Sequence, residues 1–198
     1  MMEKYRALVL FGAPGSGKGT QGKFLSKVTN HLHISSGEIL RDLPRDSELG
    51  KLFHGYMDKG ELGPDDMMIE VFKEYIENLV SKGKYDPENQ LLMLDGIPRT
   101  VPQVKLLEAL VEVEKVVFFD VGSKEALMER ISKRAAIEGR ADDTSMSILE
   151  ERMNVFEGKT LKVMGAYPKE KLITINAAQG PLFVLKDVLN HLTPLLAR

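Results

Sequence analysis

The chain of 198 residues contains no cysteine and no tryptophan, and its charges nearly balance, at a net −2. Without cysteine the protein cannot form disulfide bonds or thiolate zinc sites. No stretch approaches the ~20 consecutive apolar residues of a transmembrane helix, so no membrane partner is expected. A basic surface for nucleic acid is not expected either, because lysine and arginine (27) do not outnumber aspartate and glutamate (29).

What the sequence does contain is typical of one globular domain over residues 1–198, with 43% hydrophobic and 28% charged residues. The apolar run 7–11 is shorter than the core of a typical signal peptide, and it leads directly into a glycine-rich segment. We therefore interpret this run as a buried strand and expect the cytoplasm as the location.

Short apolar runs alternate with helix-length stretches along the chain. Four runs are typical of strands buried on both faces, and a fifth is weaker: 7–11, 91–94, 116–121, 172–175 and, as the weak candidate, 32–34. Helices are predicted between and after them, at 17–28, from Asp65 to about residue 79, and at 100–111, 123–137 and 181–192. This alternation predicts an α/β fold with a parallel sheet, helices on both faces, and ligands at the carboxyl ends of the strands.

Residues 35–59 interrupt this alternation, because they have a helical pattern but little apolar strand. We interpret them as part of a flap inserted between two strands.

The segment FGAPGSGKGTQ carries a phosphate-loop pattern, in which Gly12, Gly17 and Lys18 fit G-x-x-x-x-G-K. It follows a predicted strand and opens a predicted helix, as the motif requires. Glycines let backbone N–H groups turn inward around a phosphate, and the helix N-terminus adds positive potential. The pattern departs from the motif after the lysine, where Gly19 replaces the serine or threonine that holds Mg²⁺ and the hydroxyl follows at Thr20.

The segment LLMLDGIPRT places Asp95 at the end of a predicted strand and Arg99 just beyond it. An aspartate at this place is typical of a carboxylate that holds Mg²⁺ directly or through water. The alternative is an aspartate that only caps the turn before Gly96.

Nine arginines and four histidines complete the set of candidate residues. Arg130 and Arg134 are four residues apart, on one face of a predicted helix. Arginine suits bidentate phosphate contacts, although each one taken alone fits a solvated surface equally well. The histidines show neither metal-ligand spacing nor a nucleophile–base arrangement. A phosphate acceptor needs no catalytic base, because it is already ionised near neutrality.

Six motifs together resemble the adenylate kinases of the short-lid type, within the nucleoside monophosphate kinases: GAPGSGKGTQ, HISSGEILRD, GELGPD, LDGIPRT with Gln103, KR…GRADD and ERM. The match runs nearly end to end, and a glycine after the loop lysine is normal in this family. The resemblance implies a P-loop NTPase-like, three-layer α/β/α fold with a five-stranded parallel sheet. It also implies an inserted helical flap for the nucleoside monophosphate at 35–64 and a short lid without zinc at 135–144.

The implied activity is reversible, Mg²⁺-dependent phosphoryl transfer from ATP to AMP, giving two ADP, with these nucleotides as the partners of a monomer. The resemblance assigns ATP to Gly15, Gly17, Lys18, Gly19, Thr20, Arg130 and Arg134. It assigns AMP to Ser36, Arg41, Glu61, Leu62, Gly63, Gly96, Arg99, Gln103, Arg140 and Arg152. The catalytic set around the transferring group is Lys18, Arg99, Arg134, Arg140 and Arg152, and Asp95 organises Mg²⁺ through water.

The chain departs from the family pattern at several places. Ser36, Glu38, Ile97 and Lys162 stand where threonine, aspartate, phenylalanine and proline are usual, and Arg140 and Arg152 are one residue further apart. The departure of most consequence is Gly63, where valine is usual. We expect glycine to keep the backbone carbonyl contact but to lose apolar packing on the acceptor base, at about 1 kcal/mol.

Two other functions remain open at this point. Pyrimidine monophosphate kinases resemble this chain, but they tend to carry alanine at position 36 and asparagine at position 100, where this chain has serine and threonine. A non-catalytic ATP-binding switch protein would have no use for the acceptor-side residues Arg41, Arg99 and Gln103.

Overall fold

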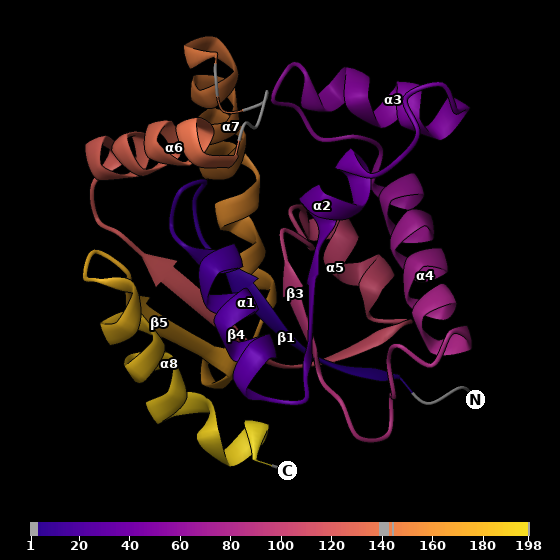
Figure 1. Ribbon diagram of the computed structural model, residues 1–198, viewed down its shortest axis with the longest axis vertical. Coiled ribbons are helices and arrows are strands. Elements are labelled where there is room, and N and C mark those ends of the chain that lie inside the picture. Colours follow the sequence, from indigo (N-terminus) through magenta and orange to yellow (C-terminus); the bar gives the residue numbers. More distant parts are fainter. Residues whose placement is uncertain (1–3, 139–142, 144, 198) are drawn as a thin grey trace.

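Five parallel strands form the centre of the computed structural model, which describes residues 4–138, 143 and 145–197. The strands are β1 (Tyr5–Phe11), β2 (Leu32–Ser35), β3 (Leu92–Asp95), β4 (Val111–Asp120) and β5 (Leu172–Asn176). They lie in the order β2-β3-β1-β4-β5, and each neighbouring pair is parallel (Figure 1). The predicted five-stranded α/β fold is confirmed, including its weakest strand.

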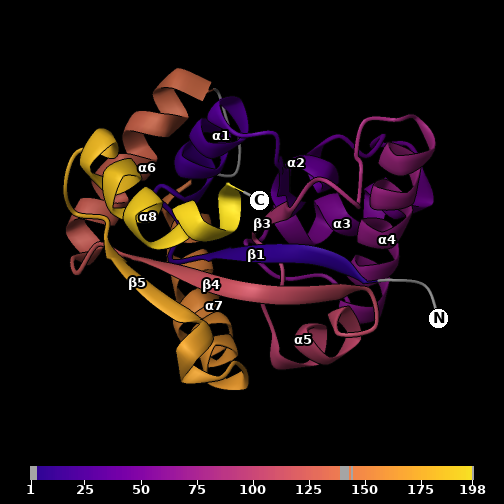
Figure 2. The ribbon, with the colours of Figure 1, turned by 90° about the horizontal axis from the view of Figure 1, so that it is seen from below.

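Helices cover both faces of the sheet. In chain order they are α1 (Lys18–Val28), α2 (Ser36–Arg41), α3 (Glu48–Met57), α4 (Asp65–Ser81), α5 (Val101–Leu107), α6 (Lys124–Glu138), α7 (Met146–Gly158), the 3₁₀ helices η2 (Thr160–Ala166) and η3 (Lys169–Lys171), and α8 (Pro181–Leu196). Seen from below, α1 and α8 lie on one side of the strands, and α5 and α7 lie on the other (Figure 2). This is the predicted three-layer arrangement.

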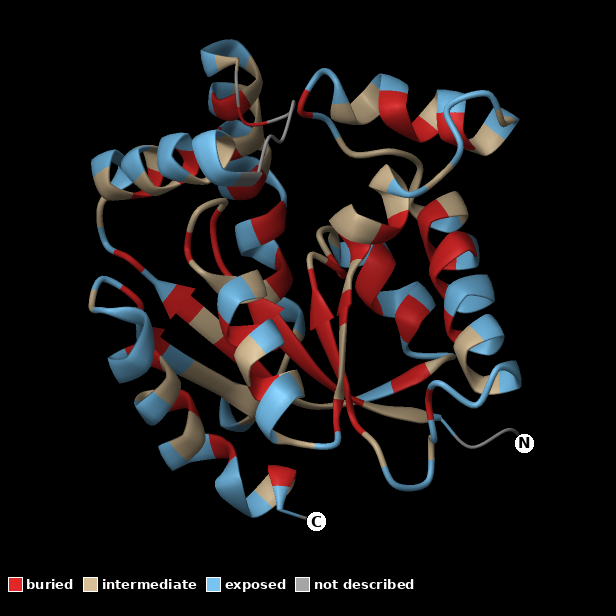
Figure 3. Cartoon of the chain, in the orientation of Figure 1, coloured by how far each residue is buried: buried red, intermediate tan, exposed pale blue. Residues whose placement is uncertain are grey.

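The central strands are apolar throughout because both of their faces are covered. Residues 7–11 of β1 are at most 3% exposed, and Leu92, Met93 and Leu94 of β3 are fully buried. Figure 3 shows this core as red strands inside helices whose outer faces are exposed. Burial on both faces explains why these strands read as continuous apolar runs in the sequence.

The structure differs from the sequence prediction at α5, β4 and α7. The helix predicted at 100–111 ends at Leu107, because Val111 already begins β4. The first half of β4, VEVEK, alternates apolar and polar residues and is only partly buried, so a search for continuous apolar runs misses it. The sequence prediction also left out α7, although its buried residues Leu149, Met153 and Phe156 have helical spacing.

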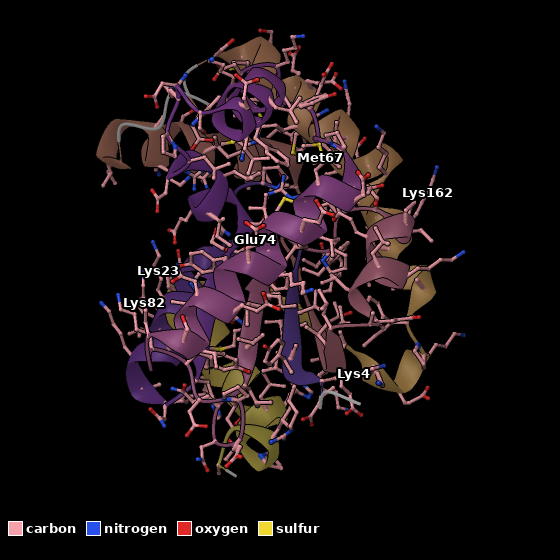
Figure 4. The ribbon with its side chains drawn as sticks, turned by 90° about the vertical axis from the view of Figure 1, so that its right-hand side faces the viewer. Lys4, Lys23, Met67, Glu74, Lys82 and Lys162 are labelled. Carbon is pink, nitrogen blue, oxygen red and sulfur yellow. The ribbon has the colours of Figure 1, made fainter. Side chains whose placement is uncertain are left out.

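The segment between β2 and β3 is helical, as predicted, and α2 and α3 lie beyond the carboxyl ends of the strands on one side of the molecule (Figure 1). On the other side, α6 and α7 extend past the same edge. Figure 4 views the molecule from the side of α4, on which Met67 and Glu74 lie. Across the described parts of the chain, every helix is too short or too polar to cross a bilayer.

Candidate active site

The loop between β1 and α1 has the backbone shape of a phosphate-binding loop. Gly15 and Gly17 adopt left-handed conformations, with φ of 80° and 95°, and Gly17 is the N-cap residue of α1. A Cβ atom on Gly15 would lie 2.8 Å from the carbonyl oxygen of Leu127, so the position requires glycine both for its conformation and for space. The Nζ of Lys18 donates hydrogen bonds to the carbonyl oxygens of Gly12 (2.7 Å) and Ala13 (2.9 Å).

The Lys18 ammonium group is buried near three arginine side chains. Burial lowers its pKa to about 8, Asp95 opposes this shift, and Arg99, Arg134 and Arg152 add to it. The cavity that these residues line has six cationic side chains and three carboxylates, so it has an excess of positive potential. Such a cavity favours a ligand with several negative charges, as a polyphosphate has.

Asp95, at the end of β3, is a buried carboxylate that lines this cavity. Burial alone would raise its pKa, but the neighbouring His33 imidazole and the charges of Lys18 and Arg99 hold the pKa below its usual range. The His33 Nε2 lies 3.5 Å from Asp95 Oδ2. A Cβ atom on Gly19 would lie 3.2 Å from the same Oδ2. Asp95 therefore stands, ionised, beside the position where the loop motif usually carries its metal-binding hydroxyl.

Asp95 and the phosphate loop suit a Mg²⁺ ion whose other ligands are nucleotide phosphates and water. Mg²⁺ in nucleotide sites is held by one or two carboxylates together with phosphates and water, and Asp95 supplies an ionised carboxylate. The described residues contain no cluster of three or more histidine, cysteine, aspartate or glutamate side chains that could hold a metal by themselves.

One large cavity at the carboxyl ends of the strands brings together most of the residues that the sequence predicted. Its lining includes Gly15, Gly17, Lys18, Gly19, Thr20, Ser36, Arg41, Glu61, Leu62, Gly63, Asp95, Gly96, Arg99, Gln103, Arg134 and Arg152. The predicted donor and acceptor residues thus face a common space. Arg140 lies outside the described residues.

Gly96, directly after β3, lines the cavity and is contacted by two other residues of the lining. Its carbonyl oxygen accepts hydrogen bonds from Ser36 Oγ (2.7 Å) and from Arg99 Nε (2.8 Å). Its φ is 78°, and a Cβ atom on it would lie 2.7 Å from Ser36 Oγ and 2.8 Å from Arg99 Nη2. Serine at position 36 therefore has a definite partner, and its hydroxyl ties α2 to the end of β3.

The amide of Gln103 is held in one orientation. Its Oε1 accepts from the backbone N–H of Arg99 (2.7 Å), and its Nε2 donates to Asp65 Oδ1 (2.8 Å). Thr100, the N-cap residue of α5, donates to the same Asp65 oxygen (2.8 Å). An N–H group can only donate and a carboxylate can only accept, so the two partners exclude the flipped amide. Gln103 is 3% exposed.

Asp143 joins two of the predicted arginines, and the sequence prediction did not single it out. Its Oδ2 accepts from Arg134 Nε (2.6 Å), and its Oδ1 accepts from Arg134 Nη2 (2.8 Å) and from Arg152 Nη1 (2.6 Å). Burial would raise the pKa of Asp143, but the two guanidinium groups hold it below its usual range. The available signal was the acidic pair that follows Arg140 in GRADD.

Arg130 is not among the residues that line the cavity. Its Nη1 and Nη2 donate to the carbonyl oxygens of Ala177 (2.8 Å) and Ala178 (3.1 Å), in the loop after β5. The structure therefore separates Arg130 from Arg134, although both lie on α6.

The departures from the family pattern have clear environments. Lys162 of η2 is exposed and projects from the surface in Figure 4, and Ile97 is 1% exposed in the core. At Gly63, where we expect lost apolar packing, the structure places an aromatic ring close by. A Cβ atom on this glycine would lie 2.6 Å from Cε1 of Phe53, so that ring already fills the space.

Sequence reasoning missed the apolar residues of α2, α3 and α4 that line the cavity. Phe53, Tyr56 and Met57 of α3 are joined there by Leu40 and Met68. The signal was the spacing of the first three, at i, i+3 and i+4, which places them on one face of a helix.

Comparison with known proteins gives consistent matches. Residues 10–172 match the family model described as adenylate kinase. The chain is 36% identical to an adenylate kinase of Bacteroides thetaiotaomicron, over 83% of this chain and 85% of the relative. It is 34% identical to an adenylate kinase of Petrotoga mobilis (93% and 96%) and 32% identical to one of Porphyromonas gingivalis (84% and 84%).

Proposed function

The chain belongs to the adenylate kinase family, and from this premise we propose that it transfers a phosphoryl group reversibly between MgATP and AMP, giving two ADP. The protein is a phosphotransferase, and the family leaves the pyrimidine kinase and the non-catalytic switch protein without support. The observation that carries the proposal is that a phosphate loop and a fixed Gln103 amide line one cavity. Such a cavity suits two nucleotides placed end to end.

The donor phosphates belong in the loop between β1 and α1. Its turned backbone offers N–H groups to phosphate oxygens, and the N-terminus of α1 adds positive potential. Lys18 would exchange its hydrogen bonds to the Gly12 and Ala13 carbonyls for phosphate oxygens. That exchange also offsets the repulsion from the neighbouring arginines.

The acceptor base belongs beside Gln103. Its amide uses one N–H on Asp65 and one lone pair on the Arg99 N–H, which leaves one donor and one acceptor for a ligand. Adenine offers the complementary pair, the N1 acceptor and the N6 amino donor. Arg41 and Arg99 line the same cavity and suit the phosphate of AMP, because a guanidinium binds phosphate in a bidentate manner.

Catalysis on this proposal consists of positioning and charge neutralisation. Lys18, Arg99, Arg134 and Arg152 surround the transferring group, and the family resemblance assigns Arg140 to the same set. The acceptor phosphate needs no base to activate it. Asp143 holds Arg134 and Arg152 in a defined orientation. Asp95 would hold Mg²⁺ through water, and the ion would supply neutralisation of the donor phosphates.

A bisubstrate inhibitor, two adenosines joined by five phosphates, tests this function. We expect it to bind far more tightly than ATP or AMP alone, because one molecule pays the entropy of association for both halves. Initial rates with AMP, CMP and UMP as acceptors should be highest for AMP. Binding no tighter than that of ATP, or a preference for CMP or UMP, would contradict the proposal.

The proposal extends to organisation and setting. We assign the acceptor flap to residues 35–64 and the lid to residues 135–144 of a single domain, and Arg130 to the donor side. We propose a cytoplasmic monomer that uses no zinc and binds neither nucleic acid nor membranes. Light scattering during size-exclusion chromatography would test the monomer.

A further inference from the structure

Gly63 is a glycine for reasons of space. It is not among the glycines with positive φ, so its backbone is open to any residue. A Cβ atom on it would nevertheless lie 2.6 Å from Cε1 and 2.9 Å from Cδ1 of Phe53. Real Cβ atoms do not approach ring carbons so closely, so any side chain at position 63 requires the Phe53 ring to move.

The Phe53 ring has little room to move. It is 1% exposed and belongs to the hydrophobic core of the protein. It comes from α3 (Glu48–Met57), whereas Gly63 lies in the connection between α3 and α4. Both residues line the cavity that also contains Gln103 and Arg99.

We propose that Phe53 determines specificity for the acceptor base, by supplying the apolar wall of the base site from α3 in place of a side chain at position 63. This inference rests on the proposed function and deepens it. A wall made by a buried, rigid ring has little conformational entropy to lose when the ligand binds.

The arrangement makes positions 53 and 63 mutually exclusive. A large side chain fits at one of them only when the other is small, because they compete for the same space. Two substitutions that are each harmful should therefore compensate when combined. Independent sites would add instead.

The experiment is a double-mutant cycle with Phe53→Ala, Gly63→Val and the combined variant, in the full chain with Mg²⁺. We expect each single substitution to raise KM for AMP roughly tenfold, with KM for ATP and kcat little changed. The combined variant should bind AMP better than Phe53→Ala does. The preference for AMP over CMP, as kcat/KM, should fall in Phe53→Ala and recover in part in the combined variant.

Gly55→Ala is the matched control. Gly55 also lies in α3, and a Cβ atom on it would meet nothing within 4 Å, so KM for AMP should not change. If Gly63→Val or Phe53→Ala unfolds, Gly63→Ala and Phe53→Leu replace them. Gly63→Ala adds only the clashing Cβ atom, and Phe53→Leu keeps a buried apolar side chain but removes the flat ring.

Three results would overturn the inference: a lower KM for AMP in Gly63→Val, additive effects in the combined variant, or an unchanged AMP over CMP preference in Phe53→Ala. These results differ from failure of the proposed function, in which the unsubstituted protein would itself show no transfer between ATP and AMP.

Discussion

Asp65 controls which base edge Gln103 can read, and its removal should relax the choice of acceptor. In the structure, Asp65 Oδ1 accepts from Gln103 Nε2 and from Thr100 Oγ1, each at 2.8 Å. IMP presents the inverse of the adenine edge, with a donor at N1 and an acceptor at position 6. To bind it, the Gln103 amide must flip, which turns its carbonyl oxygen toward the Asp65 carboxylate and its NH₂ group toward the Arg99 N–H.

The size of the effect follows from these contacts. A hydrogen bond to a charged acceptor contributes about 1.5–3 kcal/mol to the preferred orientation. Asp65→Ala removes this contribution and leaves only the Arg99 N–H to oppose the flip. We expect the AMP over IMP preference, measured as kcat/KM, to fall about tenfold or more, since about 1.4 kcal/mol corresponds to a factor of ten. KM for ATP should be unchanged.

The assay is ADP formation at saturating MgATP with varied AMP or IMP, in Asp65→Ala, Asp65→Asn and Asp66→Ala. Asp65→Asn keeps the shape of the side chain but can donate to a flipped Gln103, so it should also lose preference. Asp66→Ala is the matched control, because Asp66 is exposed in the same first turn of α4 and its Oδ1 accepts from the adjacent Met67 N–H rather than from Gln103. An unchanged AMP over IMP preference in both Asp65 variants would refute the reasoning.

The remaining predictions concern charge at the transferring group. Lys18→Ala should lower kcat by about 10³-fold or more while the fold survives, because a cation at the transferring phosphates acts mainly in the transition state. Arg41→Ala and Arg99→Ala should raise KM for AMP far more than KM for ATP, and Arg130→Ala should act on the ATP side, as steady-state kinetics would show. Nucleotide binds the protonated form of Lys18, so with its pKa at about 8, ADP affinity measured by calorimetry should be nearly flat between pH 7 and pH 8 and fall at most about tenfold per unit above pH 8.

Each of these predictions has an outcome that contradicts it. Near-normal turnover in Lys18→Ala would remove Lys18 from the mechanism. If Arg99→Ala raised KM for ATP more than KM for AMP, the assignment of the donor and acceptor sites would have to be reversed. ADP affinity that stays constant between pH 7 and pH 9.5 would mean that Lys18 keeps its proton in the free protein over that range.

The order of elements and the donor loop could be predicted from the sequence because their signals are local. Strands buried on both faces read as apolar runs, and a loop that turns through left-handed conformations requires glycines at fixed places, as at Gly15 and Gly17. The arginines could be assigned only through a resemblance to a family. Apart from Arg130 and the undescribed Arg140, those assignments fall on the lining of one cavity.

Other features depend on distances between residues that are remote in sequence. Spacing alone did not indicate that Asp143 bridges Arg134 and Arg152, or that Asp65 holds an amide 38 residues further along the chain.

Gly63 shows the difference most clearly. Its sequence context indicated a lost contact at the acceptor base, and the tertiary structure places the Phe53 ring 2.6 Å from where its Cβ atom would be. The sequence by itself determined the fold class and the phosphate loop, since backbone conformation and burial leave periodic patterns along a chain. Only the tertiary structure decided which side chain fills a given space, because that depends on which distant elements the fold packs against it.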